Sequence, residues 1–162
     1  MTDAALLILR SWLGLVMLVH GSNHLRSLEG TAKWFGSIGF KQARLNAIAS
    51  GFGEVTIGLG LILGLFTSVA VTGLVTVMTI AFIAVHRKAG FFVFNRPDEG
   101  WEFVATLAVS GLVLAILGPG RWSIDSALGI DLTGWWGVAF ALGGAVLAGV
   151  MLGAFWRPSS DH

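Results

Sequence analysis

The chain has 162 residues, of which 55% are hydrophobic and 12% are charged, and its formal net charge is +1. A soluble domain of this size would need a far more polar surface, so the composition predicts a membrane protein in contact with the lipid bilayer. The charge is near neutral and no long basic run occurs, which excludes nucleic acid as an expected partner, and the absence of cysteine excludes disulfides and iron–sulfur ligation.

Five apolar runs of about 20 residues, each near the length that crosses a hydrocarbon core, recur along the chain. They cover residues 4–25, 47–66, 69–86, 101–117 and 135–156. The start, MTDAALL, has no basic region or convincing cleavage site, so we expect an uncleaved first span. Thr67 and Ser68 leave room only for a tight connection, which makes the second and third spans antiparallel neighbours. We therefore expect an all-α membrane protein, a four-helix transmembrane bundle with a fifth transmembrane helix.

Positive charges are distributed unevenly between the two sides of this arrangement. Eight lysines and arginines fall on one side, whereas the opposite side holds only Arg121, and Arg10 lies inside the first span. Because cytoplasmic loops retain lysine and arginine, the pattern predicts a bacterial plasma membrane protein with an external amino terminus and a cytoplasmic carboxy terminus. The residues assigned to the cytoplasmic side are Arg26, Lys33, Lys41, Arg44, Arg87, Lys88, Arg96 and Arg157.

Five titratable residues come toward the same end of the membrane from four spans. They are His20, His24, Glu54, His86 and Glu102. Titratable groups are costly in hydrocarbon, so their clustering at one depth predicts a polar pocket near the cytoplasmic side. Each residue also has a structural alternative. Glu54 could bond to a neighbouring helix, the two histidines of the first span could be satisfied by backbone or water, and His86 and Glu102 could be solvated in the loop.

Two polar stripes extend these faces inward at helical spacing, one formed by Thr72, Thr76 and Thr79 and the other by Thr106 and Ser110. A bundle interior explains both stripes. Arg10 lies about 10 Å from Glu54 along the membrane normal, so a direct pair requires a long reach. Its stem leans toward the amino terminus, which favours an extension to the outer headgroups. We keep it as a candidate partner of Glu54.

The connecting segments have mainly structural interpretations. The run TAKWFGSIGFKQAR is typical of a segment in the headgroup region. In AGFFVFNRPDEGWE, Phe91, Phe92 and Phe94 could line the mouth of a pocket or pack at the interface. The run GPGRWSID is a turn to which we assign no chemistry. In the fifth span, Gly149 and Gly153 form a G-x-x-x-G pair that permits close packing, internally or against a second protein.

Four segments occur in a characteristic order: LRSWLGLVMLVHGSNHL, GEVTIGLGLILGLFT, HRKAGFFVFNRPDEGWE and GPGRWSID. Over about residues 6 to 130 the chain resembles the DoxX family of small bacterial membrane proteins. The resemblance implies a four-helix core over residues 1–130, followed by an additional helix and a short cytoplasmic tail over residues 131–162. The family is similar to the membrane subunit of an archaeal thiosulfate:quinone oxidoreductase, and some members are thought to join membrane complexes linked to oxidative stress.

On the family pattern, six residues fall at motif positions: Arg10, His20, Gly21, Glu54, Glu102 and Arg121. His24 departs from the pattern, because it stands where the family often has lysine or arginine. This difference weakens any transfer of a fixed charge to that position. The fifth span lies outside the resemblance, so its role is not implied by the family.

Three functions remain open. The first is a quinone-linked oxidoreductase subunit, in which Glu54 and His20 transfer protons to a quinone from the bilayer as electrons arrive from a partner protein. The residues that would contact the cofactor are Arg10, His20, His24, Glu54, His86 and Glu102. A variant is a site for iron, manganese or zinc, although no signature spacing supports it. The second is a non-enzymatic anchor or scaffold for a membrane or soluble partner protein. The third, a proton or solute carrier, would need discontinuous helices or repeated halves, and neither is visible.

Overall fold

The computed structural model describes residues 1–94 and 99–158, and in these ranges the chain is almost entirely helical. The long apolar runs form helices because a helix satisfies its own backbone hydrogen bonds in lipid. Among the described residues, four helices are long and apolar enough to cross a membrane: α1 (Thr2–Arg26), α3 (Ala43–Leu63), α4 (Thr67–Ala81) with its π-helical continuation η1 (Phe82–His86), and α7 (Trp135–Phe155). The all-α membrane fold is confirmed.

The fourth expected span, residues 101–117, forms a helix that is shorter than the others. It is α5 (Glu102–Leu117), and its 16 residues extend about 24 Å at 1.5 Å per residue. A hydrocarbon core is about 30 Å thick, so this helix alone falls short of crossing it.

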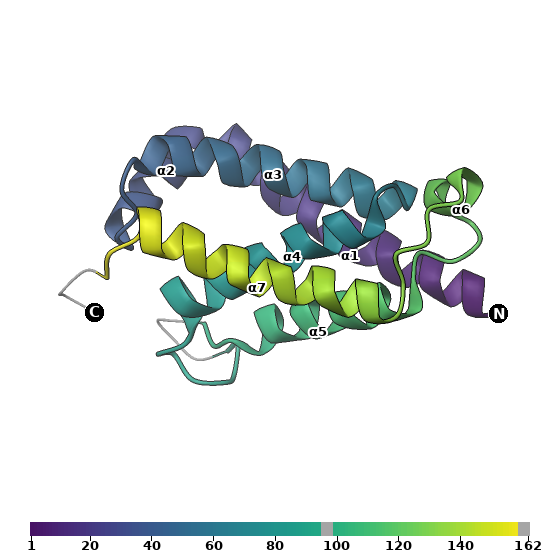
Figure 1. Ribbon diagram of the computed structural model, residues 1–162. Helices are drawn as coiled ribbons and strands as arrows, with labels where there is room; N and C mark the ends of the chain where they lie inside the picture. The colour runs from purple at the N-terminus through teal and green to yellow at the C-terminus, as the bar shows by residue number, and fades with distance from the viewer. Residues whose placement is uncertain (95–98, 159–162) are drawn as a thin grey trace.

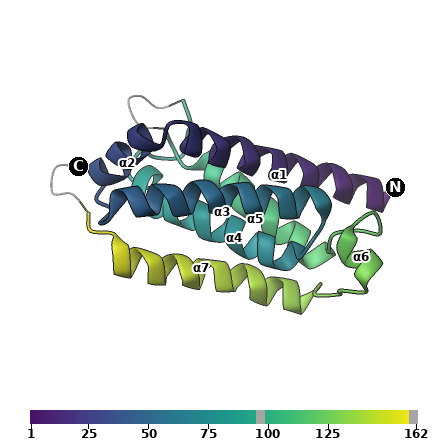
Figure 2. The same ribbon diagram turned by 90° about the horizontal axis from the view of Figure 1, so that it is seen from above.

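The helices form a bundle with α1 and α3 side by side on one flank and α7 on the other, against α4 and α5 (Figures 1 and 2). A short helix, α2 (Leu28–Ser37), lies at the end of the bundle that holds the carboxy terminus, and α6 (Ile124–Leu128) lies at the end that holds the amino terminus (Figure 1). The segments expected to carry the cytoplasmic charges therefore share one end. Arg96, counted among those charges, lies outside the described residues.

Glycines allow α1 and α3 to approach closely along their antiparallel packing. A Cβ atom on Gly14 would lie 2.6 Å from the carbonyl oxygen of Gly58, and one on Gly21 would lie 2.6 Å from the carbonyl oxygen of Gly51. Real Cβ atoms do not approach an oxygen so closely, so only glycine fits at these positions. The contact holds the two helices at backbone distance over about two turns.

The turn between α3 and α4 is tight, as the sequence predicts, and two buried charges hold it. Arg10 is 1% exposed and donates hydrogen bonds to the carbonyl oxygens of Leu61, Ile62 and Trp122. The carboxylate of Asp125 accepts hydrogen bonds from the backbone N–H groups of Phe66 and Thr67, at 2.7 and 2.8 Å. Arg10 thus satisfies the carbonyl end of α3 and Asp125 the amino end of α4.

Threonines of α4 bind it to α7. The hydroxyl of Thr72 donates to the carbonyl oxygen of Phe140 at 2.9 Å, and that of Thr76 donates to the carbonyl oxygen of Gly144 at 3.0 Å. The stripe predicted to lead toward His86 therefore serves helix packing. The stripe predicted on α5 is not an interior one, because Thr106 is exposed and bonds to its own helix.

Candidate functional site

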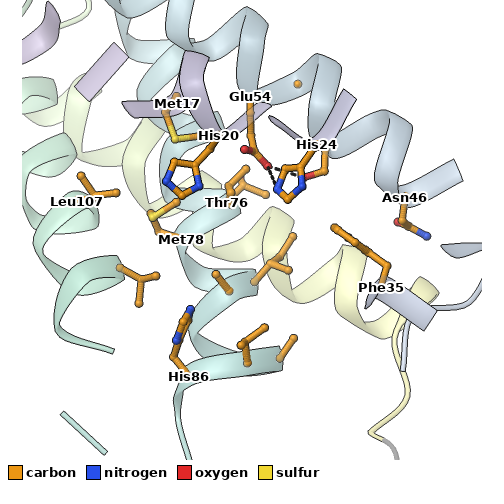
Figure 3. Close-up of a pocket in the computed structure, with 18 of the residues that line it drawn as sticks. Met17, His20, His24, Phe35, Asn46, Glu54, Thr76, Met78, His86 and Leu107 are labelled. Carbon is orange, nitrogen blue, oxygen red and sulfur yellow. Dashed lines mark hydrogen bonds and ion pairs between the residues drawn. The ribbon is translucent and has the colours of Figure 1, made fainter. Parts of the chain in front are cut away.

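A cavity of about 640 Å³ lies inside the bundle, toward the end that holds α2 (Figure 3). Its walls come from α1, α2, α3, α4, η1, α5 and α7, and most of its lining side chains are aliphatic or aromatic. The volume is in the range of pockets that hold a drug-sized ligand. The polar residues in the lining are His20, His24, Asn46, Ser50, Glu54, Thr76, His86 and Glu99.

Glu54 and His24 lie next to each other in the lining of this cavity. Glu54, on α3, is 3% exposed, and its Oε1 atom lies 3.6 Å from Nε2 of His24, on α1. The hydroxyl of Ser50, one turn earlier on α3, donates a hydrogen bond to the same Oε1 atom. Both contacts fall on Oε1, so Oε2 is the oxygen atom that can meet a molecule in the cavity. The expected meeting of Glu54 with a histidine of α1 is found in the structure.

The close approach of α1 and α3 creates this pair. Gly21 on α1 and Gly51 on α3 are in contact, and His24 and Glu54 each lie three residues beyond one of them. Residues three apart on a helix share a face, so both side chains project beside the same interface. Side chains larger than glycine at the contact would separate the carboxyl group from the imidazole.

His20 and His24 both line the cavity, but their surroundings differ. The His24 ring meets Phe35 of α2 edge to face, with centroids 6.2 Å apart. The His20 ring stacks on Phe103 of α5 at the same separation, with an interplanar angle of 26°. His20 is exposed, whereas His24 is half-buried. The imidazole next to Glu54 is therefore that of His24, and His20 stands at the side of the cavity.

A polar row on α3 connects Glu54 to the end of the bundle. Asn46, Ser50 and Glu54 are spaced by four residues, and all three line the cavity. Asn46 donates from its side-chain amide to the carbonyl oxygen of Lys41 at 2.7 Å. The spacing puts the three side chains on one face, one turn apart. The row leads from Lys41, outside α3, to the buried carboxyl group.

His86 lines the cavity from the last residue of η1, and its Nδ1 atom lies 2.7 Å from the carbonyl oxygen of Glu99. A π-helical turn inside an apolar helix is uncommon and is often found at functional sites. Here it turns the end of the α4–η1 helix toward the loop before α5. Glu99 itself also lines the cavity, which the sequence did not suggest.

Two predicted site residues lie apart from this cavity. Glu102 is not in its lining, and its backbone N–H donates to the carbonyl oxygen of Phe91 at 2.9 Å, which fixes the start of α5 in the loop. Arg10 is buried at the opposite end of α3, so the expected reach to the outer headgroups is wrong, and Arg10 does not pair with Glu54, for which it was kept as a candidate partner. Its guanidinium binds backbone carbonyl oxygens instead.

Over residues 1–94 and 99–158, no three histidine, aspartate or glutamate side chains come close enough together to hold a metal ion. Glu54 and His24 form a pair, but His20 stacks on Phe103 and His86 is bonded at the loop. The mixed nitrogen and oxygen ligand set considered for iron, manganese or zinc is therefore not assembled by these side chains.

The connecting segments differ in part from the expectations. Trp34, Phe35 and Ile38, expected in the headgroup region, line the cavity. Phe91, Phe92 and Phe94, considered for a pocket mouth, are exposed, and Phe91 packs against Trp101 with centroids 4.8 Å apart. A segment assigned no chemistry supplies Asp125, which holds the turn before α4.

On α7, no atom lies within 4 Å of a Cβ built on Gly149 or Gly153, so their G-x-x-x-G pair does not pack inside this chain. Gly144 packs inside the chain, because a Cβ atom on it would lie 2.5 Å from the carbonyl oxygen of Thr72. The internal packing face of α7 is therefore the one that carries Gly144.

A sequence model of the DoxX family matches residues 5–87. This region runs from α1 to the end of η1 and so contains the Glu54–His24 pair, His20 and His86. The cavity walls contributed by α5 and α7 lie outside it. No curated protein and no solved structure matches the chain.

Proposed function

The chain belongs to the DoxX family, and on this premise we propose that it is a quinone-binding subunit of a membrane redox complex. The observation that carries the proposal is the cavity of about 640 Å³, apolar except for a few groups, with Glu54 and His24 in contact on its wall. A quinone suits such a cavity because its ring is flat and apolar and its two carbonyl oxygens accept hydrogen bonds.

The proposed reaction is the reduction of the quinone to its quinol. Two electrons and two protons are added, and one O–H bond forms at each former carbonyl oxygen. The electrons come from a redox protein partner, since the chain has no cysteine to hold an iron–sulfur cluster. Glu54 presents Oε2 to the quinone and acts as a general acid, and His24 stabilises the carboxylate that remains.

The polar row on α3 supplies the protons. Asn46 and Ser50 form two steps between the end of the bundle and Glu54, and Ser50 already donates a hydrogen bond to Glu54. After Glu54 has transferred its proton, water at the end of the bundle supplies the next proton, and this row is the polar route along which that proton reaches Glu54. On the orientation that the basic residues favour, the protons come from the cytoplasmic side.

Quinone binding is tested by filling the cavity. Gly53 lines it, and a Cβ atom there would have no atom within 4 Å, so Gly53→Leu places a side chain in empty space. Gly143 on α7 is equally open but lies outside the cavity lining, which makes Gly143→Leu the matched control. We expect saturable quenching of tryptophan fluorescence by a short-chain quinone in the wild type and in Gly143→Leu, and its loss in Gly53→Leu.

The proton role is tested separately with Glu54→Gln. The amide keeps the shape of the carboxyl group and can still hydrogen-bond to the quinone, but it cannot donate a proton and regain it. With a chemical reductant as the electron source, we expect the variant to bind quinone while the rate of proton uptake, followed with a pH-sensitive dye, falls at least about tenfold. A wild type that binds no quinone would favour the alternative function, a non-enzymatic anchor for a partner protein.

A further inference from the structure

Two aromatic rings from α1 and α5 meet in the lining of the cavity. His20 of α1 and Phe103 of α5 both belong to the cavity lining, and their rings stack with centroids 6.2 Å apart. Both side chains are also exposed, Phe103 to 43%, which fits a pair of rings that lies between the cavity and the outside of the bundle.

The pair of rings lies at a depth where the bundle is surrounded by lipid. His20 precedes the end of α1 at Arg26 by six residues, which is about 9 Å along the helix. Its neighbour Val19 is 57% exposed, as expected of a surface in contact with hydrocarbon. Along its length α1 packs mainly against α3 and meets α5 over a much smaller area. The gap between α1 and α5 at this depth is therefore closed by side chains and not by backbone.

We propose that His20 and Phe103 form a side gate through which a quinone passes directly between the bilayer and the cavity. The inference rests on the proposed function for the class of ligand and adds the route. Stacked rings at this separation attract each other only weakly, so thermal motion can separate them. The flat quinone ring moves past the two aromatic faces, and its long isoprenoid tail stays in the gap between α1 and α5 and in the surrounding lipid.

The absence of cysteine from the chain allows a direct test. In the double variant His20→Cys/Phe103→Cys, a short bifunctional thiol reagent links α1 to α5 across the gate. We expect the unlinked double variant to bind and release a long-tailed quinone. Linking before the quinone is added should block binding, and linking afterwards should trap the quinone through repeated washing with empty vesicles. Equal binding and release before and after linking would overturn the gate.

A second variant tests the gate if the double variant does not bind the long-tailed quinone. Phe103→Ala removes the gate but leaves His20, and we expect the rates of quinone association and dissociation both to rise about three- to tenfold, with little change in their ratio. Val109→Ala is the matched control, because Val109 is exposed on the same helix and lies outside the cavity lining. Rates that do not change in Phe103→Ala would contradict the gate.

A long-chain alkylbenzene with a bromine atom on the ring separates this inference from the proposed function. It has the ring and the tail of a quinone but no carbonyl oxygens, and bromine quenches tryptophan fluorescence. If it enters faster in Phe103→Ala while no quinone binds to any form of the protein, the gate stands and the quinone function falls. If quinone binds but its rates do not depend on residue 103, the function stands and the gate falls.

Discussion

Gly21 and Gly51 lie so close that a methyl group on Gly21 would stand 2.6 Å from the carbonyl oxygen of Gly51. This contact brings α1 and α3 together at the depth of the cavity, and it sets the distance between His24 and Glu54 three residues further along each helix. The resemblance to the family placed Gly21 and His20 at motif positions, and the close contact gives a physical reason for a residue without a side chain at position 21.

Replacing Gly21 with alanine should therefore separate the helices. Overpacking of this kind typically costs about 1 to 3 kcal/mol, more than alanine gains in helix propensity. We expect a lower melting temperature in detergent for Gly21→Ala, together with weaker quinone binding. Gly143→Ala, at an open position on α7, should be neutral or slightly stabilising. Equal melting temperatures for the two variants would contradict the close-packing argument.

Ser50 should act on ligand binding through Glu54 and contribute little to the stability of the fold. Its hydroxyl holds Oε1 of Glu54, which directs Oε2 toward the cavity. Loss of one such hydrogen bond costs about 0.5 to 1.5 kcal/mol, so Ser50→Ala should weaken quinone binding about two- to tenfold in a fluorescence titration. Ser50→Thr keeps the hydroxyl and should restore the affinity. Thr56→Val removes an outward-facing hydroxyl from the same helix and should leave it unchanged.

Arg10 should matter for stability and not for the ligand. Arg10→Met removes the side-chain donor from the carbonyl oxygens of Leu61, Ile62 and Trp122, of which that of Leu61 still accepts a hydrogen bond from the backbone N–H of Gly64. A buried group that is left without its hydrogen bond costs about 1 to 3 kcal/mol. We expect a marked loss of thermal stability, while the folded fraction binds quinone with the wild-type affinity. Arg10→Lys keeps the charge but not the forked geometry, so its thermal stability should lie between those of the wild type and Arg10→Met. If Arg10→Met folds with normal stability but no longer binds quinone, Arg10 contributes to quinone binding and the structural role is contradicted.

These contrasts show what the sequence could provide. The apolar runs predicted the five long helices to within four residues at each end, because length and hydropathy decide which segments enter a bilayer. The meeting of Glu54 with a histidine of α1 could also be predicted, since a carboxyl group in such an apolar run requires a partner. The position of Arg10 could not be predicted, because its partners are backbone carbonyl oxygens. One of them, that of Trp122, lies 112 residues away in the chain.

Other parts of the site depend on packing that a sequence pattern does not contain. Thr72 and Thr76 form a polar stripe at helical spacing, but the pattern does not distinguish a cavity wall from a helix interface. Glu102 was expected among the ligands because it opens a span, yet the first turn of α5 is held in the loop by Phe91. Phe103, one residue later, looked like any other apolar residue of that span.

The α4–α7 interface should weaken when its hydroxyl groups are removed. Hydrogen bonds between membrane helices contribute about 0.6 to 2 kcal/mol each, so the double variant Thr72→Val/Thr76→Val should lose about 1 to 4 kcal/mol of stability. Thermal unfolding in detergent measures the loss. Thr106→Val is the matched control, since Thr106 bonds only within α5. If the double variant and Thr106→Val have the same melting temperature, close packing at Gly144 is sufficient to hold α7 against α4.

The orientation in the membrane is measurable with single cysteines, because the natural chain contains none. Ser37, at the end of α2, and Ser126, in α6, are both exposed and lie at opposite ends of the bundle (Figure 1). The basic residues gather at the α2 end, which predicts that this end faces the cytoplasm. A membrane-impermeant maleimide should therefore label Ser126→Cys on intact cells and Ser37→Cys only after the membrane is opened. The reverse pattern would place the proton-supplying row of α3 on the outer side, so that the protons for Glu54 would be taken from outside the cell.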